Sequence, residues 1–183
     1  FAYGNANYIV VGAAIEAITG QSWEDAMRAE VYGPLGLTSA GFGPPPSPNA
    51  WGHRAGLTAI APTSPGADNP LALGPAGTAH MTLADYGRFL AVFLSEGGGW
   101  ISADSIARLT APAEGSPPGY ACGWLVRGQG PERALAHEGS NTMWHAGALV
   151  QPGRNRAVIA VSNDGQAGRR AVQDLMVRLN ALA

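Results

Sequence analysis

A tyrosine and an asparagine, Tyr3 and Asn5, stand one residue apart just before a segment with a helical pattern. A phenol has a pKa of about 10, so it becomes a usable base only beside a cation. An amide offers an acceptor and two donor hydrogens with which to orient a substrate. Read alone, the pair has a simpler explanation, because asparagine commonly caps a helix start and tyrosine can pack beside it.

A second polar stretch, His137-Glu138-Gly139-Ser140-Asn141, lies between two runs with the pattern of β-strands. An imidazole can gain or lose a proton near neutral pH, and a strand glycine lets another backbone approach closely. Taken alone, His137 is better explained as a structural histidine. The Tyr-x-Asn pair upstream is what favours a catalytic role for it.

Tyr-x-Asn at a helix start followed, well over a hundred residues later, by His-x-Gly at a strand end resembles two of the three signatures of the serine β-lactamase-like hydrolases. That superfamily includes class C β-lactamases, DD-peptidases, D-aminopeptidases and esterases. Its first signature, Ser-x-x-Lys, is absent, because all 11 basic residues are arginines and arginine cannot act as a general base. We therefore expect the nucleophile on a segment upstream of Phe1, or an inactive site.

The resemblance implies acyl transfer through a covalent serine ester. It gives Tyr3 the role of shuttling protons between nucleophile, leaving group and water. Asn5 would hydrogen-bond the substrate amide or the absent lysine. His137 stands where β-lactamases carry the lysine of Lys-Thr-Gly, and it would donate to the Tyr3 oxygen or to a substrate carboxylate. These three residues are the expected catalytic groups.

The resemblance also implies substrate-binding roles for Gly139, Ser140 and Asn141, with the Ser140 N–H as half of an oxyanion hole. The substrate would be a small or peptide-like amide or ester: a β-lactam, a D-amino-acid peptide or an ester. His-x-Gly in place of Lys-Thr-Gly favours a peptidase or esterase. The parent protein is then a serine hydrolase, and this chain alone is inactive. The alternative is a non-catalytic relative that binds ligands or has a structural role.

Composition excludes several other classes. Apolar residues make up 46% and charged residues 13% of the 183 positions, which indicates a folded, core-forming chain. A net charge of −2 without a basic run argues against a nucleic-acid partner, and the apolar runs are too short to span a membrane. The single Cys122 can form no internal disulfide. The four histidines lack the spacing of a metal site, so we expect neither metal nor cofactor. The compartment stays open between periplasmic, secreted and cytoplasmic.

Helical periodicity followed by strand-like runs predicts an α+β fold. The resemblance assigns residues 1–115 to a partial helical subdomain and 116–183 to the C-terminal strands and closing helix of an α/β subdomain. Missing N-terminal strands would complete its sheet, so we expect the absent segment or another chain on the open sheet edge. The first helix should bury Tyr8, Val11, Ile15 and Ile18. Ser22 and Thr82, each followed three residues later by an aspartate, have the capping-box pattern and should begin two further helices. The expected helices are 7–19, 22–31, 83 to the glycines 97–99, 103–109 and 169–183. The expected strands are 120–127, 134–138, 144–151 and 156–163, and the last of these should be covered on both faces. Residues 43–75 should form a long Pro/Gly-rich loop.

Overall fold

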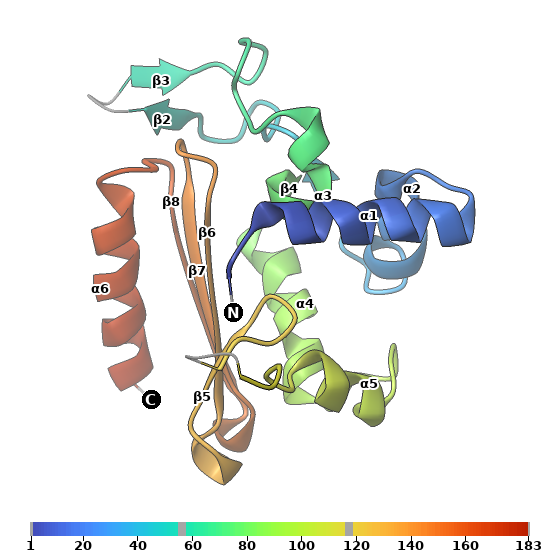
Figure 1. Ribbon diagram of the computed structural model, residues 1–183. Coiled ribbons are helices and arrows are strands. Elements are labelled where there is room, and N and C mark those ends of the chain that lie inside the picture. The colour runs from blue at the N-terminus through green and yellow to red at the C-terminus, as the bar shows by residue number, and fades with distance from the viewer. Residues whose placement is uncertain (1, 55–57, 116–118, 183) are drawn as a thin grey trace.

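The computed structural model describes residues 2–54, 58–115 and 119–182 of the chain. Its order of elements is helices first and a sheet afterwards, as Figure 1 shows. The helices are α1 (Asn5–Thr19), α2 (Trp23–Met27), α3 (Gly74–Gly77), α4 (Leu83–Leu94), α5 (Ala103–Leu109) and α6 (Gly168–Ala181). Within the described residues, no helix is long and apolar enough to cross a membrane.

The main sheet has four antiparallel strands in the order β5-β6-β7-β8, which is also their order along the chain. Their bounds are β5 (Leu125–Arg127), β6 (Ala134–Ser140), β7 (His145–Gln151) and β8 (Arg156–Ser162). Helix α6 packs on one face against β7 and β8, and α4 packs on the other face. Because side chains alternate along a strand, each of the central strands contributes to both layers.

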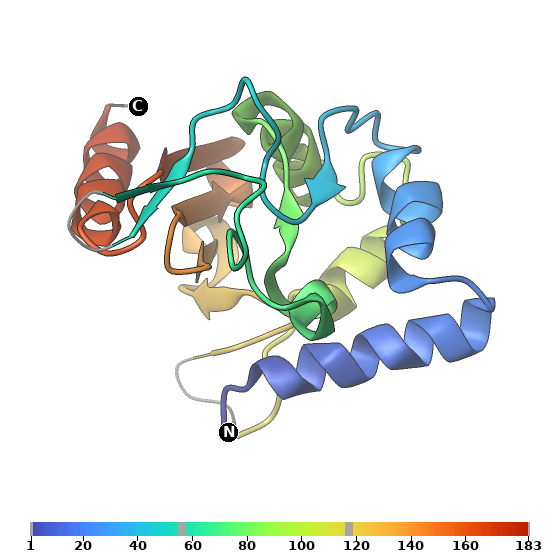
Figure 2. The ribbon, with the colours of Figure 1, turned by 90° about the horizontal axis from the view of Figure 1, so that it is seen from above.

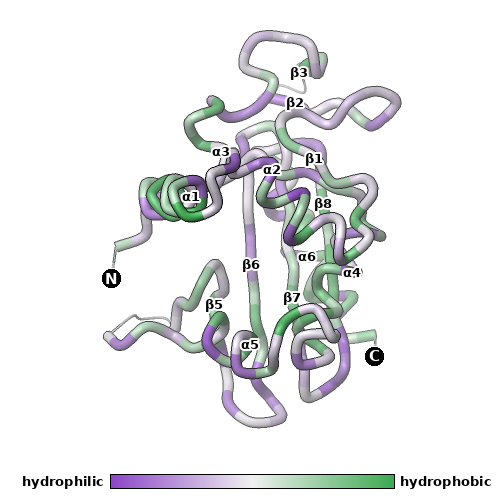
Figure 3. The backbone as a smooth tube through the Cα atoms, turned by 90° about the vertical axis from the view of Figure 1, so that its right-hand side faces the viewer, coloured by the Kyte–Doolittle hydropathy of each residue, from purple (hydrophilic) through white to green (hydrophobic). Residues whose placement is uncertain are grey.

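The main core lies between α4 and the sheet. Its buried members are Leu90, Val92, Phe93, Ala121, Trp124, Leu135, Ala148 and Val150. Burying one large apolar side chain stabilises the fold by roughly 1.5–3 kcal/mol, so this cluster sets the position of the inner strands. In Figure 3 the hydrophobic colour follows β7, whereas the middle of β6 is hydrophilic.

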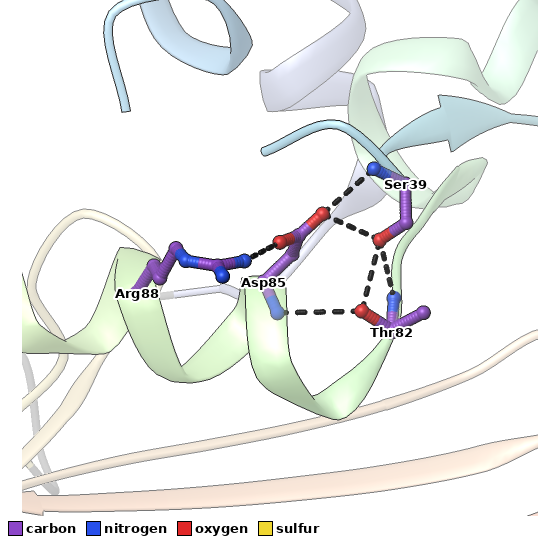
Figure 4. Close-up of polar contacts among 4 residues, drawn as sticks. All are labelled: Ser39, Thr82, Asp85 and Arg88. Atoms are coloured by element: carbon purple, nitrogen blue, oxygen red, sulfur yellow. Dashed lines mark hydrogen bonds and ion pairs between the residues drawn. The ribbon is translucent and has the colours of Figure 1, made fainter. Parts of the chain in front are cut away.

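Helix α4 is fixed at its start by a network around a buried carboxylate (Figure 4). Thr82 caps the helix by accepting from the Asp85 N–H, as predicted, but the Thr82 N–H donates to Ser39 Oγ rather than to Asp85, so only half of the capping box forms. Asp85 is 2% exposed, and its Oδ2 accepts from both the N–H and the hydroxyl of Ser39, at 2.7 and 2.5 Å. Its Oδ1 accepts from Arg88. These bonds, those of Ser39 first, hold the pKa of Asp85 below its usual value.

The predicted α+β architecture is confirmed, with one strand much shorter than expected. Helix 103–109 agrees with α5 residue for residue, and the strand expected at 120–127 is β5, which spans only Leu125–Arg127. Residues Tyr120 to Trp124 instead form a tight turn, in which the Ala121 N–H donates to the Trp124 carbonyl at 2.8 Å. Gly123 has φ of 80°, a left-handed conformation that suits glycine and interrupts a strand.

The burial expected for α1 is wrong in this structure. Val11 is 52% exposed and Ile18 is 85% exposed. The helix instead packs through Gly12, where an added Cβ would lie 2.2 Å from the ring of Pro75. The prediction selected the helix face with the largest apolar side chains. It missed the packed face of α1 because the closest contact there is made by Gly12, which has no side chain.

Strand β8 is covered less completely than its apolar run predicted. Val158 and Ala160 are buried, but Val161 is 44% exposed. Among the described strands β8 pairs with β7 alone, so its other edge carries no strand partner. The apolar run predicted cover on both faces of the strand, whereas the described residues cover Val161 only in part.

The Pro/Gly-rich region at 43–75 contains a small hairpin, β2 (Gly52–Arg54) and β3 (Thr58–Ile60), whose intervening residues 55–57 lie outside the described part. Figures 1 and 2 show it lying over the end of the main sheet. The His53 N–H donates to the carbonyls of Met143 and Asn163. The remaining short strands, β1 (Gly41–Phe42) and β4 (Ala79–His80), pair with each other. The predicted boundary at 115–116 adjoins residues 116–118, which are also outside the described part.

Candidate active site

Strand β6 carries three of the six predicted site residues, His137, Gly139 and Ser140, on its exposed half. Strand β5 pairs with β6 only from Ala134 to Ala136. From His137 to Ser140 the strand is exposed, and in the described part of the chain its outer edge has no strand partner. Backbone groups on such an edge can pair with an extended ligand.

The ring of His137 has a defined orientation. Its Nδ1 lies 2.7 Å from the Gly123 carbonyl oxygen, which can only accept, so Nδ1 carries the hydrogen. The ring also packs edge-on against Trp124, with centroids 6.0 Å apart. In neutral imidazole Nε2 is then an acceptor, and it can donate only when the ring is a cation.

Gly139 and Ser140 follow on the same strand. A Cβ added to Gly139 would lie 3.7 Å from His137 Nε2, so the absent side chain leaves room beside that nitrogen. The Ser140 hydroxyl donates to the Trp144 carbonyl at 2.5 Å and accepts from the Thr142 N–H. Its single proton is engaged, so the backbone N–H is what Ser140 has left to offer a ligand.

Asn141 is largely engaged within the protein. Its Oδ1 accepts from the N–H groups of Met143 and Trp144, which closes the turn between β6 and β7. Its Nδ2 donates to Asp68 at 2.7 Å. The substrate contact expected of Asn141 stays a prediction, and it would compete with these bonds.

The N-terminal pair lies at the exposed start of α1; Phe1, the first residue of that stretch, is outside the described part. The Tyr3 hydroxyl donates to Asn5 Oδ1 at 3.1 Å, and Asn5 is the first residue of the helix, whose predicted start at residue 7 was two residues late. Gly4 occupies the N-cap position and makes no side-chain cap. Tyr3 is 67% exposed, so the described residues cover only about a third of it.

The two motifs meet at the turn Tyr120–Trp124. The Tyr3 ring packs edge-on against Tyr120, with centroids 6.1 Å apart and planes at 82°. At the other end of the same turn, the Gly123 carbonyl accepts from His137. Sequence reasoning missed Tyr120 because it assigned this segment to a strand; the glycines at 119 and 123 were the available signal for a turn.

The opposite face of β6 carries a separate polar cluster. Glu138 accepts from Gln173 of α6 at 3.0 and 3.2 Å and lies 3.8 Å from Arg169. His145, 5% exposed, has its Nε2 3.6 Å from Glu138, too far for a hydrogen bond. Because side chains alternate along a strand, Glu138 points away from the His137 side, and the cluster connects β6 to α6.

One hollow borders this cluster, and a larger one lies elsewhere in the described part of the chain. The smaller lies over the Glu138 cluster and is lined by Glu138, Gly139, Ser140, His145, Gly165 and Arg169. The larger lies among loops of the helical part, lined in part by Glu24, Phe42, Asp68 and Leu71. Asp68 connects the larger hollow to the site through its bond with Asn141. In the described part of the chain, no three His, Cys, Asp or Glu side chains are gathered so as to hold a metal ion.

Comparison with known proteins bears on the whole chain. The family model described as Beta-lactamase matches residues 1–183. Penicillin-binding protein 4 of Amycolatopsis lactamdurans is 27% identical, over 90% of this chain and 48% of that protein. The chain thus spans about half the length of this relative.

Solved structures share the fold. The crystal structure of SurE matches with a TM-score of 0.80 at 24% identity, over 99% of this chain and 45% of that one. D-amino acid amidase from Ochrobactrum anthropi SV3, complexed with D-phenylalanine, matches with a TM-score of 0.76 at 20% identity, over 100% of this chain and 62% of that one. With a family model that covers its full length, this chain belongs to the beta-lactamase family.

Proposed function

We propose that this chain forms the C-terminal portion of a serine hydrolase that cleaves an amide or ester through an acyl-enzyme. Tyr3, Asn5 and His137 are its proposed catalytic groups, and Gly139, Ser140 and Asn141 line the substrate. The observation that carries the proposal is the turn Tyr120–Trp124, which contacts Tyr3 at one end and His137 at the other. Family membership supports the class of chemistry.

The tautomer of His137 refines its proposed role. With the Nδ1 hydrogen bonded to Gly123, neutral His137 presents an acceptor at Nε2. It would then accept a hydrogen bond from the Tyr3 hydroxyl or from a substrate N–H. The imidazolium would donate to a substrate carboxylate, so the two states suit different substrates.

The nucleophilic serine and its lysine come, in this proposal, from residues outside the chain, because the chain contains no lysine. The free edge of β8 is where we place a further strand, from that outside segment or from another chain. Residues 1–115 and 116–183 are proposed as parts of two subdomains with the site between them. This chain alone would be inactive.

The test uses a longer gene product that contains this chain, treated with a fluorophosphonate and, separately, with penicillin, followed by intact-mass spectrometry. We expect one covalent adduct on a serine outside residues 1–183. Tyr3→Phe should lower the acylation rate roughly 100- to 10,000-fold, as the loss of a proton shuttle does. Tyr32→Phe is the matched control, because the buried Tyr32 hydroxyl has no hydrogen-bond partner among the residues that the structure describes.

The second candidate is a non-catalytic relative, favoured by the same absence of lysine. It predicts no adduct on the longer product, together with saturable binding of a D-amino-acid peptide. Acylation that is insensitive to Tyr3→Phe would overturn the catalytic assignments while leaving the enzyme class in place.

A further inference from the structure

The turn Tyr120–Trp124 is anchored independently of the site. Trp124 is 6% exposed and packs edge-on against Phe93 of α4, with centroids 4.9 Å apart. The Cys122 N–H donates to the Leu109 carbonyl, and Tyr120 bridges to Leu125 at the start of β5. These contacts connect the turn to the close-packed main core. The turn therefore has a fixed position, and side chains that pack against it are positioned by it.

Tyr120 connects the turn to both the N-terminal motif and α1. Its ring meets the edge of Tyr3, and its phenol is hydrogen-bonded to the phenol of Tyr8. Burial, and next this hydrogen bond, raise the pKa of Tyr120 well above its usual value. Tyr120 therefore keeps its proton across the ordinary pH range and can donate it to Tyr8 of α1.

The other end of the turn determines the His137 ring. The Gly123 carbonyl sets the hydrogen on Nδ1, and the Trp124 ring supports the imidazole from one side. Gly123 is required in this conformation, because φ of 80° disfavours any residue with a Cβ. One short turn thus contacts two of the three proposed catalytic groups, Tyr3 and His137.

We propose that Tyr120 is a positioning residue that sets Tyr3 relative to His137 through this turn. The inference rests on the proposed function. It adds to that function a further residue, Tyr120, and a structural connection between Tyr3 and His137. Tyr3 lies at an exposed helix start, where the turn supplies a contact for its ring, and His137 lies on an exposed strand edge, where the turn orients its imidazole. Misplacing a reacting group by about 1 Å can cost roughly 100-fold in rate, so such a support affects catalysis.

Two substitutions separate the contacts of Tyr120. Tyr120→Phe keeps the ring against Tyr3 and removes the bond to Tyr8, as Tyr8→Phe does from the other side. Tyr120→Leu removes the aromatic edge as well. Because Tyr8→Phe and Tyr120→Phe break the same hydrogen bond, their effects should be less than additive in the double variant. Tyr32→Phe again serves as the control.

The first measurement does not depend on activity: fluorine NMR of fluorotyrosine at Tyr3 and nitrogen NMR of the His137 ring. Tyr120→Leu should shift both the Tyr3 and His137 signals, Tyr120→Phe should shift them less, and Tyr32→Phe should shift neither. If Tyr120→Leu moves the Tyr3 signal and leaves the His137 ring unchanged, the proposed connection is wrong.

The second measurement is steady-state kinetics on the longer gene product. We expect Tyr120→Leu to lower kcat by roughly 10- to 100-fold with KM nearly unchanged. Unchanged kcat despite shifted resonances would overturn the positioning role. Absence of any acylation in the unsubstituted protein would instead refute the proposed function, and the NMR comparison would still decide whether the turn couples the two motifs.

Discussion

Helix α1, which carries Asn5 and follows Tyr3, and strand β6, which carries His137, differ in how the rest of the chain packs against them. On α1 only Gly12 is buried, while Val10 is 68% and Ile18 is 85% exposed. On β6 Leu135 is buried, at 2% exposed, and its neighbours Ala134 and Ala136 are partly buried. Each motif lies beyond the packed part of its own element.

The difference teaches how the proposed site is supported. His137 is held by a strand whose register is set by the core two residues earlier, at Leu135 opposite Val150. Tyr3 has no buried core residue close to it along the chain; its hydroxyl bonds to Asn5 of the same segment, and its ring packs against the distant Tyr120. We therefore expect the free energy needed to open β6 to be close to that of unfolding the whole chain. The start of α1 should open locally at a much lower free energy.

The largest expected effect tests the buried half of β6. Leu135→Ala should lower the free energy of unfolding by about 2–5 kcal/mol, because it leaves a cavity in the main core. Val10→Ala on α1 should change it by no more than about 0.5 kcal/mol. Chemical denaturation of both variants checks this. A cost above about 1 kcal/mol for Val10→Ala would show that another surface covers α1.

A smaller, pH-dependent effect tests the start of α4, whose side-chain cap has no counterpart at the start of α1. The native pKa of Asp85 is lowered, so its contribution to stability is present above the unfolded value of about 3.9 and is lost as the pH falls through the native pKa. Asp85→Asn should be less stable at pH 7, and the difference should shrink below about pH 4. Asp104→Asn, at an exposed position in the first turn of α5, is the control. A difference that stays constant down to acid pH would contradict the assignment.

The smallest effect concerns the cap that α1 lacks. Gly4 is extended, with φ of −163°, and an added Cβ would meet Asn7 only at 3.9 Å. Gly4→Ser should supply the missing cap oxygen and raise stability by a few tenths of a kcal/mol, about 1 °C or less in Tm. Gly4→Ala should do the opposite, since it adds no acceptor. Equal melting temperatures for the two variants would show that the start of α1 is already held from elsewhere.

Features set by neighbouring residues were predicted well from the sequence. The caps Ser22 and Thr82 each accept from the N–H three residues on, and α5 has its predicted bounds. Hydrogen bonds of this kind depend on spacing along the chain, so the sequence states them directly. The alternation that placed Glu138 opposite His137 is equally local.

Features that depend on distant residues were not predicted. Asn141 bonds to Asp68, 73 residues away, and the contact of Gly12 with Pro75 redirected the buried face of α1. The turn at Tyr120 replaced half of a predicted strand, because a glycine in the left-handed conformation outweighed the apolar pattern around it.

The residue types alone determined which chemistry this chain can offer: a phenol, a carboxamide and an imidazole, with no lysine to act as base. Only the tertiary structure decided that Tyr3 and His137 meet the same turn and that Nδ1 of His137 carries its hydrogen. The reason is that chemical character belongs to each side chain, whereas proximity and tautomer depend on partners that the fold brings together across more than a hundred residues.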